Sequence, residues 1–188
     1  IPNSVTTIAG GAFDHNSLTS VTIPDNVTTL GEGAFMNNSI ASLTISNSIT
    51  SIGVNTFALN SLASITIPSS VTSIGGYAFG GNALTSVTIP NTVTSIGSYA
   101  FYINSLTSVI IGNSVATIGG SAFRDNALTS ITIPSSVTSI GDYAFHSNSI
   151  TKAYFEGNAP TLSSSAFYGQ TPTLYYQSGA TGWTDPYE

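Results

Sequence analysis

The 188-residue sequence predicts a single repeat solenoid, made of about eight coils of 22 residues each. Two periodic features lead to this prediction: eight of the nine Phe residues recur every 22 positions, and an Ile or Leu stands five positions before each of them. Periods of about 20–50 residues are typical of solenoids, in which each coil buries its apolar side chains only against its neighbours. The recurring Phe residues are Phe13, Phe35, Phe57, Phe79, Phe101, Phe123, Phe145 and Phe167.

Each coil is expected to contain two short parallel strands joined by turns. In one coil, residues 86–89 alternate between hydroxyl and β-branched aliphatic side chains, which indicates a short strand. Pro90 ends this strand because proline cannot donate to a ladder. Residues 93–96 form the second extended segment, and Gly97 is expected to adopt a positive φ. Residues 99–101 are then expected to form a short helical or 3₁₀ turn that directs the Phe side chain inward.

A polar column accompanies the Phe column, three positions after it. Asn at a tight turn can satisfy backbone groups of its own coil and of the next one. We therefore expect these side chains to stabilise the stack rather than to bind a ligand. The column consists of Asn16, Asn38, Asn60, Asn82, Asn104, Asn126 and Asn148, and Gln170 ends it.

The two ends of the chain differ in how well they keep the repeat. Residues 1–150 form a regular solenoid that is expected to be uncapped at its N-terminus, because Ile1 stands in the same column as Ile23. An uncapped coil exposes an apolar layer, so we expect either that upstream repeats have been removed or that another molecule covers this end, for which self-association is one possibility. Residues 151–188 read as a degenerate last repeat and a C-terminal cap, which carries the only Trp, Trp183.

The segment IPNTVTSIGSYAFYINSLTSV, residues 89–109, closely resembles the BspA-like bacterial class of leucine-rich repeats. The pattern IP…V…IG…AF…L carries the resemblance over residues 1 to about 150, although many family members have Cys where this chain has the Asn column. The resemblance implies a leucine-rich-repeat fold and a surface-exposed or secreted bacterial protein. Several proteins of this class are adhesins that bind host or matrix proteins, so an extracellular or cell-surface location is expected.

Composition excludes several classes of partner and chemistry. Only 5% of the residues are charged, and two Lys+Arg stand against eight Asp+Glu, so the chain cannot neutralise a nucleic acid backbone. No apolar run approaches the roughly 20 residues that span a bilayer, so no membrane insertion is expected. Cys is absent, His15 and His146 lie about six coils apart, and no acidic residue recurs from coil to coil. We therefore expect no enzymatic activity, no metal and no cofactor.

Hydroxyl groups line the outward positions of the first predicted strand. They could form a solvated sheet, a contact surface for protein or glycan, or an ice-binding surface, although Ile110 interrupts one of the two columns. The candidate strand face consists of Ser42, Thr44, Ser64, Thr66, Ser86, Thr88, Ser108, Ser130 and Thr132.

Tyrosines near the Phe column are a second candidate, because Tyr buries much area at low entropic cost in interfaces. The candidate aromatic edge consists of Tyr77, Tyr99, Tyr102 and Tyr143, which could also simply pack against their own loops. The leading hypothesis is a non-catalytic binding or adhesion repeat region of a bacterial surface or secreted protein, whose partner is a protein or glycan surface. The alternatives are a structural subunit of an extracellular fibre or sheath and, third, an ice-binding solenoid.

Overall fold

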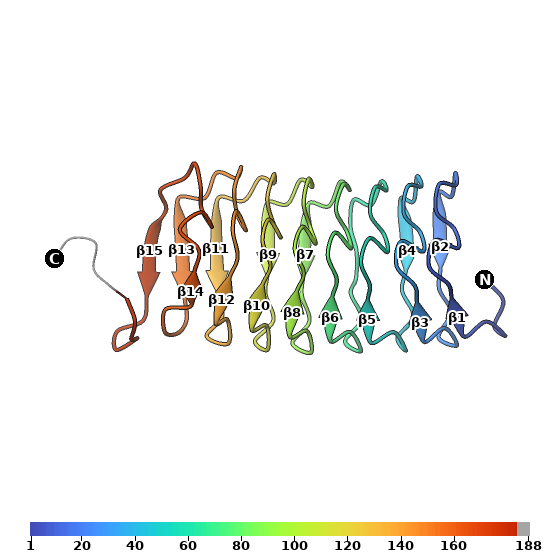
Figure 1. Cartoon of the computed structure of the whole chain (residues 1–188), viewed down its shortest axis with the longest axis horizontal. Coiled ribbons are helices and arrows are strands. Elements are labelled where there is room, and N and C mark those ends of the chain that lie inside the picture. Colours follow the sequence, from blue (N-terminus) through green and yellow to red (C-terminus); the bar gives the residue numbers. More distant parts are fainter. Residues whose placement is uncertain (184–188) are drawn as a thin grey trace.

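The computed structural model describes residues 1–183 as a solenoid of parallel strands whose coils follow one another in a single row (Figure 1). Strand partners lie 22 residues apart along most of the row, for example Thr117 with Ser139. The predicted repeat solenoid of about eight coils is therefore confirmed.

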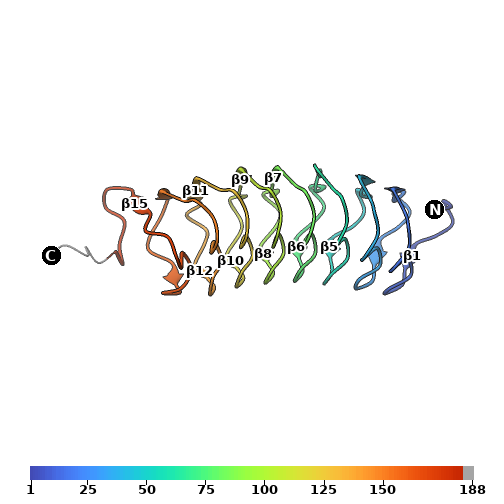
Figure 2. The same ribbon diagram turned by 90° about the horizontal axis from the view of Figure 1, so that it is seen from above.

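Two sets of strands occupy opposite sides of the coils, with β7, β9 and β11 along one side and β8, β10 and β12 along the other (Figure 2). The first strand side consists of β2 (Ser20–Thr22), β4 (Ser42–Thr44), β7 (Ser86–Thr88), β9 (Ser108–Ile110), β11 (Ser130–Ile133), β13 (Lys152–Phe155) and β15 (Thr173–Tyr176). The second strand side consists of β1 (Thr7–Ile8), β3 (Thr29–Leu30), β5 (Ser51–Ile52), β6 (Ser73–Ile74), β8 (Ser95–Ile96), β10 (Thr117–Ile118), β12 (Ser139–Ile140) and β14 (Thr161–Leu162).

The two strand sides differ in continuity. On the second side, β5, β6, β8, β10, β12 and β14 form one six-stranded sheet, and β1 pairs with β3. On the first side the strands form three separate sheets, β2–β4, β7–β9 and β11–β13–β15. Ser64 and Thr66, which were predicted to lie on the first strand, are outside the assigned strands, so the first sheet is interrupted in that coil.

The expected short helical or 3₁₀ segments are absent from residues 1–183, where hydrogen-bonded turns take their place. The reason lies two positions before each stacked Phe, where the chain is left-handed in seven coils. Tyr99, at φ 61°, is one of these residues. A right-handed helix cannot continue through such a residue. The left-handed residues of this column are Gly11, Gly33, Asn55, Tyr77, Tyr99, Ser121 and Tyr143.

The reason for glycine at position 97 also differs from the prediction. Gly97 does not have a positive φ, but it lies against the backbone of the preceding coil. A Cβ there would stand 2.6 Å from the carbonyl carbon of Gly75 and 2.6 Å from the amide nitrogen of Gly76. The coils can therefore stack at this corner only without a side chain.

The core is a continuous line of Phe rings flanked by aliphatic residues. Adjacent rings stack with centroids 5.1–5.7 Å apart from Phe13 to Phe167, as the period of 22 predicts. Phe57, Phe79 and the next three members of the line are fully buried. Each such side chain contributes roughly 1.5–3 kcal/mol of hydrophobic stabilisation, which a single coil could not provide.

The Asn column joins neighbouring coils through the backbone. The side-chain amide of Asn104 donates to the carbonyl oxygens of Phe79 at 3.0 Å and Phe101 at 3.2 Å. Its Oδ1 accepts the backbone N–H of Leu84 at 3.0 Å. The same contacts recur at the other members from Asn38 to Asn148. The predicted structural role of this column is therefore confirmed.

The ends of the row expose different surfaces. At one end, Ile1, Pro2, Phe13 and Leu18 contribute to the lining of a cavity of about 370 Å³. At the other end, the ring of Trp183 stacks on Tyr176 at 4.9 Å and meets Phe155 edge-on at 4.7 Å. The division into a solenoid of residues 1–150 and a cap of residues 151–188 stays a prediction, and residues 184–188 of that cap lie outside the described part. β13 and β15 continue the parallel pairing beyond residue 150.

Candidate functional site

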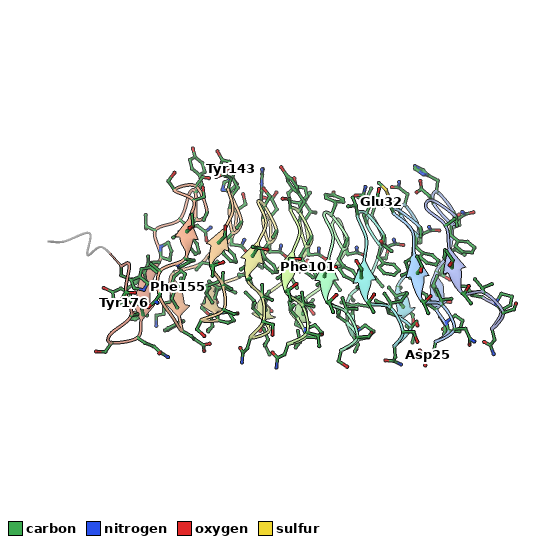
Figure 3. All side chains as sticks on the ribbon, turned by 60° about the horizontal axis from the view of Figure 1, so that its bottom comes forward. Asp25, Glu32, Phe101, Tyr143, Phe155 and Tyr176 are labelled. Carbon is green, nitrogen blue, oxygen red and sulfur yellow. The ribbon has the colours of Figure 1, made fainter. Side chains whose placement is uncertain are left out.

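A third long surface of the solenoid lies between the two strand sides. We define the loop edge as the positions three and two before and one and two after each stacked Phe. Glu32 and Tyr143 belong to it and lie along the same edge, whereas Asp25 lies along the opposite one and Phe101 lies between them (Figure 3).

The loop edge is where the coils differ most from one another. The position directly after the stacked Phe is occupied in chain order by Asp14, Met36, Ala58, Gly80, Tyr102, Arg124, His146 and Tyr168. The stacked position itself is Phe in every coil. Because repeated positions maintain the stacking of a solenoid, the varied positions are the ones that can differ for binding.

Several edge residues are held in a conformation that their side chains disfavour. The position two residues after each stacked Phe is left-handed, and it includes Leu59 at φ 55° and Ile103 at φ 47°. Left-handed backbone costs roughly 1–2 kcal/mol for residues other than glycine. Neither side chain belongs to the buried core, because Leu59 is 38% exposed and Ile103 is 47% exposed. Backbone strain of this kind concentrates at functional sites.

Three of the four predicted edge tyrosines form one cluster. The ring of Tyr77 lies 6.4 Å from that of Tyr99 and 5.9 Å from that of Tyr102, and the last two meet edge-on at 5.5 Å. Burial raises the pKa of Tyr77, and repulsion from the phenolate of Tyr102 raises it further. The guanidinium of Arg124 lies 5.6 Å above the ring of Tyr102, and its Nε is 3.3 Å from a carboxylate oxygen of Asp125.

Tyr143 does not join that cluster but forms a second one two coils further along. Its ring packs edge-on against His146 at 5.7 Å and against Tyr168 at 5.6 Å. The Nδ1 of His146 donates to the carbonyl oxygen of Tyr168 at 2.7 Å. The sequence reasoning did not select Arg124 or His146 for this site, although their place in the varied positions beside the Phe column could have indicated them.

The nine predicted hydroxyl residues of the first strand side are all exposed. Ser86 pairs with Ser108, and Thr88 pairs with Ile110, whose side chain is 60% exposed. The Thr column is thus broken by Ile110 and the first sheet is broken at Ser64 and Thr66, so this side is not a continuous regular array.

The second strand side carries a longer hydroxyl array that the sequence reasoning did not select. In-register pairs such as Ser73 with Ser95 continue along the six-stranded sheet. Threonine hydroxyls directly before these strands bond to the backbone of the preceding coil. Thr72 donates to the carbonyl oxygen of Thr50 at 3.0 Å, and Thr94 donates to that of Thr72 at 3.2 Å. These bonds indicate that this side stabilises coil stacking.

Groups suited to catalysis or metal binding do not converge in the described residues. Asp14 and His15 are paired through Oδ1 and Nδ1 at 2.9 Å, and the hydrogen bond from His15 lowers the pKa of Asp14. Within residues 1–183, no three His, Cys, Asp or Glu side chains are grouped so that they could hold a metal ion. In the same range, no helix is long and apolar enough to cross a membrane.

Comparisons with solved structures place the fold among bacterial leucine-rich-repeat proteins. A leucine-rich repeat protein from Bacteroides ovatus matches with a TM-score of 0.51 at 24% identity, over 92% of this chain and 59% of that one. A leucine rich cell surface protein from Faecalibacterium prausnitzii matches with a TM-score of 0.57 at 29% identity, over 80% of this chain and 43% of that one. The pneumococcal vaccine antigen PcpA matches with a TM-score of 0.51 at 20% identity, over 81% of this chain and 36% of that one.

The chain therefore spans less than two thirds of each of these three proteins. No curated protein matches the sequence. The family described as BspA type leucine rich repeat region matches six copies over residues 1–104 and 50–174. Because these matches cover most of the chain, this chain belongs to the BspA-type leucine-rich-repeat family.

Proposed function

We propose that this chain is a non-catalytic binding repeat region of a bacterial cell-surface or secreted protein, and that it binds protein partners through the loop edge. Membership of the BspA-type family and the likeness to a leucine rich cell surface protein support a surface-related repeat protein. The proposal also includes the kind of partner, which is a host or matrix protein to which the chain adheres.

One observation carries the choice of the loop edge. The loop edge combines exposed aromatic and aliphatic side chains with strained backbone at positions where the coils differ. Tyr99 is 43% exposed and Tyr143 is 40% exposed, and both stand at left-handed positions. Tyr is enriched in interfaces because its ring buries a large area at low entropic cost.

The two strand sides support binding less well. Exposed hydroxyls already bond to water and gain only about 0.5–1.5 kcal/mol each when they bond to a partner. The first side is interrupted at Ser64, Thr66 and Ile110, and the hydroxyls of the second side bond to neighbouring coils. These interruptions also weigh against the ice-binding alternative on the first side.

The absence of enzymatic activity is part of the proposal. The potential acid–base pair Asp14 and His15 lies in the first coil, whereas His146 lies in the seventh. Asp142 accepts hydrogen bonds from the hydroxyls of Ser163 and Ser165. No imidazole bonds to either serine among the described residues, so neither is activated as a nucleophile.

The proposal is tested by comparing edge and strand-side variants in binding to immobilised fibrinogen, fibronectin and collagen. The edge pair is Tyr99→Asn with Tyr143→Asn, because Asn tolerates left-handed backbone and lacks the ring. The control pair is Ser86→Ala with Thr88→Ala on the first strand side. We expect the edge pair to lose binding and the control pair to keep it.

Circular dichroism should show that both pairs fold like the wild type. Loss of binding in the strand-side pair, with the edge pair unaffected, would show that the edge is the wrong surface. A wild-type chain that binds none of these proteins would contradict the adhesion proposal, and substrate turnover traced to one residue would contradict the non-enzyme proposal.

A further inference from the structure

We infer that the loop edge accepts a basic, extended segment of a partner protein, whose Lys or Arg side chains lie over the tyrosine rings and beside the edge carboxylates. This inference rests on the proposed function of the loop edge and adds the chemistry of the partner.

Charge is the first argument. Most of the charged side chains in the described part of the chain lie on the loop edge, and all but one of these are acidic: Asp14, Glu32, Arg124, Asp125 and Asp142. The exception, Arg124, is paired with Asp125 at 3.3 Å, so the remaining edge charges are negative. The whole sequence has a net charge of -6, which favours approach of a cationic partner from a distance.

One of the edge carboxylates is already held in place for a cation. Asp142 is exposed, and its Oδ1 accepts hydrogen bonds from Ser163 and from Ser165, the latter at 3.2 Å. Tyr143, the next residue, begins the second aromatic cluster. A partner cation at this point would meet a fixed carboxylate and a neighbouring ring without the entropic cost of ordering either.

The chain itself contains an example of the proposed contact. The guanidinium of Arg124 lies 5.6 Å above the centroid of the Tyr102 ring, within the range of a cation–π interaction. The rings of this cluster can therefore take a cation on a face. A partner Lys or Arg would make the same kind of contact with the exposed ring of Tyr99 or Tyr143.

The spacing of the two clusters indicates the form of the partner. Tyr99 and Tyr143 occupy equivalent positions two coils apart, which corresponds to about 10 Å at roughly 4.8 Å per coil. A peptide in the extended polyproline II conformation advances about 3.1 Å per residue and presents every third side chain on the same face, so basic residues three positions apart would reach both clusters.

The inference is tested with twelve-residue peptides in which Lys stands at every third position of a Gly/Ser background. Matched peptides carry Gln or Glu instead of Lys, and binding to the full chain is measured by calorimetry at low and at raised NaCl. We expect the Lys peptide to bind best and to bind more weakly in high salt. We expect Tyr99→Asn and Tyr143→Asn each to weaken it about two- to fivefold, the size of an exposed cation–π contact.

Three charge variants test whether the peptide is attracted by the loop edge itself or only by the net charge of the chain. Asp142→Asn should weaken binding of the Lys peptide, whereas Asp25→Asn, the same change on the opposite edge, should leave it unchanged. Arg124→Gln should strengthen binding, because it frees the Tyr102 ring and removes a repelling charge.

An equal effect of Asp25→Asn and Asp142→Asn would show non-specific attraction and overturn the inference. So would equal affinity for the Gln and Lys peptides, or no binding of the Lys peptide at low salt. In each of these cases the proposed function would still stand if the tyrosine pair abolished binding to the matrix proteins, so the two failures are distinguishable.

Discussion

The Asn column offers the sharpest test of how the coils are joined, and Asn104→Ala in the middle of the stack is the change to make. The substitution leaves the backbone N–H of Leu84, a fully buried residue, without the acceptor that it has at 3.0 Å. It also removes donors to the carbonyls of Phe79 and Phe101. The carbonyl of Phe79 keeps a second donor, the amide of Asn82 at 3.1 Å.

The expected loss of unfolding free energy is dominated by the orphaned N–H. A buried donor without a partner costs about 1–3 kcal/mol, and each lost hydrogen bond adds about 0.5–1.5 kcal/mol. Because the carbonyl groups keep other donors, we expect a total of about 2–4 kcal/mol. Asn104→Asp should be at least as harmful, because its carboxylate can still accept from Leu84 but its other oxygen would repel the carbonyl oxygens of Phe79 and Phe101 that the amide now binds.

The assay is urea unfolding followed by far-UV circular dichroism, with the slope of the transition compared among variants. The control is Asn91→Ala, which removes an exposed acceptor for the N–H of Asn113 at 2.9 Å that water can replace. We expect the control to change stability by less than about 0.5 kcal/mol. Similar losses in the two variants, or a loss below about 1 kcal/mol for Asn104→Ala, would refute the role of the column.

Four further predictions concern the packing of the core, the backbone conformation and the ionisation of Tyr77. Phe101→Ala should cost about 3–5 kcal/mol and Phe13→Ala less, because the ring of Phe13 is stacked on one side only. Gly97→Ala should destabilise by more than about 1 kcal/mol, because its Cβ would stand 2.6 Å from backbone atoms of the preceding coil. Ile103→Gly should stabilise by up to about 1 kcal/mol by relieving its left-handed strain. The raised pKa of Tyr77 means that its contribution to stability is complete below pH about 10 and is lost as pH rises through the folded-state pKa.

Urea unfolding measures the first three changes and, repeated at rising pH, the fourth. Equal losses for the two Phe variants would contradict the stacking of the core, and an unchanged stability of Gly97→Ala would contradict the close approach of coils. A destabilised Ile103→Gly would show that the side chain contributes more than its backbone strain costs. For the alkaline effect, Tyr77→Phe should show a smaller fall in stability above pH 10 than the wild type; an identical fall would exclude this tyrosine as the cause.

The first strand side shows why the candidate site was predicted less well than the fold. Alternation of side chains correctly predicted which residues of the strand face are exposed, including Ser64 and Thr66. It could not predict that this coil lacks strand pairing there, since backbone pairing depends on the neighbouring coils. Nor could it show that hydroxyls on the second side, such as that of Thr94, bond to the preceding coil.

The aromatic edge was partly predicted for a similar reason. The positions of Tyr77 and Tyr99 in one column indicated that they lie near each other, and they do. The same column placed Tyr143 with them, but Ser121 intervenes and the ring packs with His146 instead. Residues that share a column have side chains that point in the same direction from the solenoid axis. Contacts between long side chains also depend on which residue occupies that column in the next coil.

The sequence by itself determined the period, the stacked Phe line and the role of the Asn column, because a residue repeated every 22 positions must occupy equivalent surroundings in every coil. The tertiary structure alone decided what joins or separates those equivalent positions. It replaced the expected helical turn with left-handed residues such as Tyr99, and it assigned Gly97 to a close approach between coils. The physical reason is that a sequence pattern specifies which way a side chain points, whereas backbone conformation and contact between coils are settled only when neighbouring coils compete for the same space.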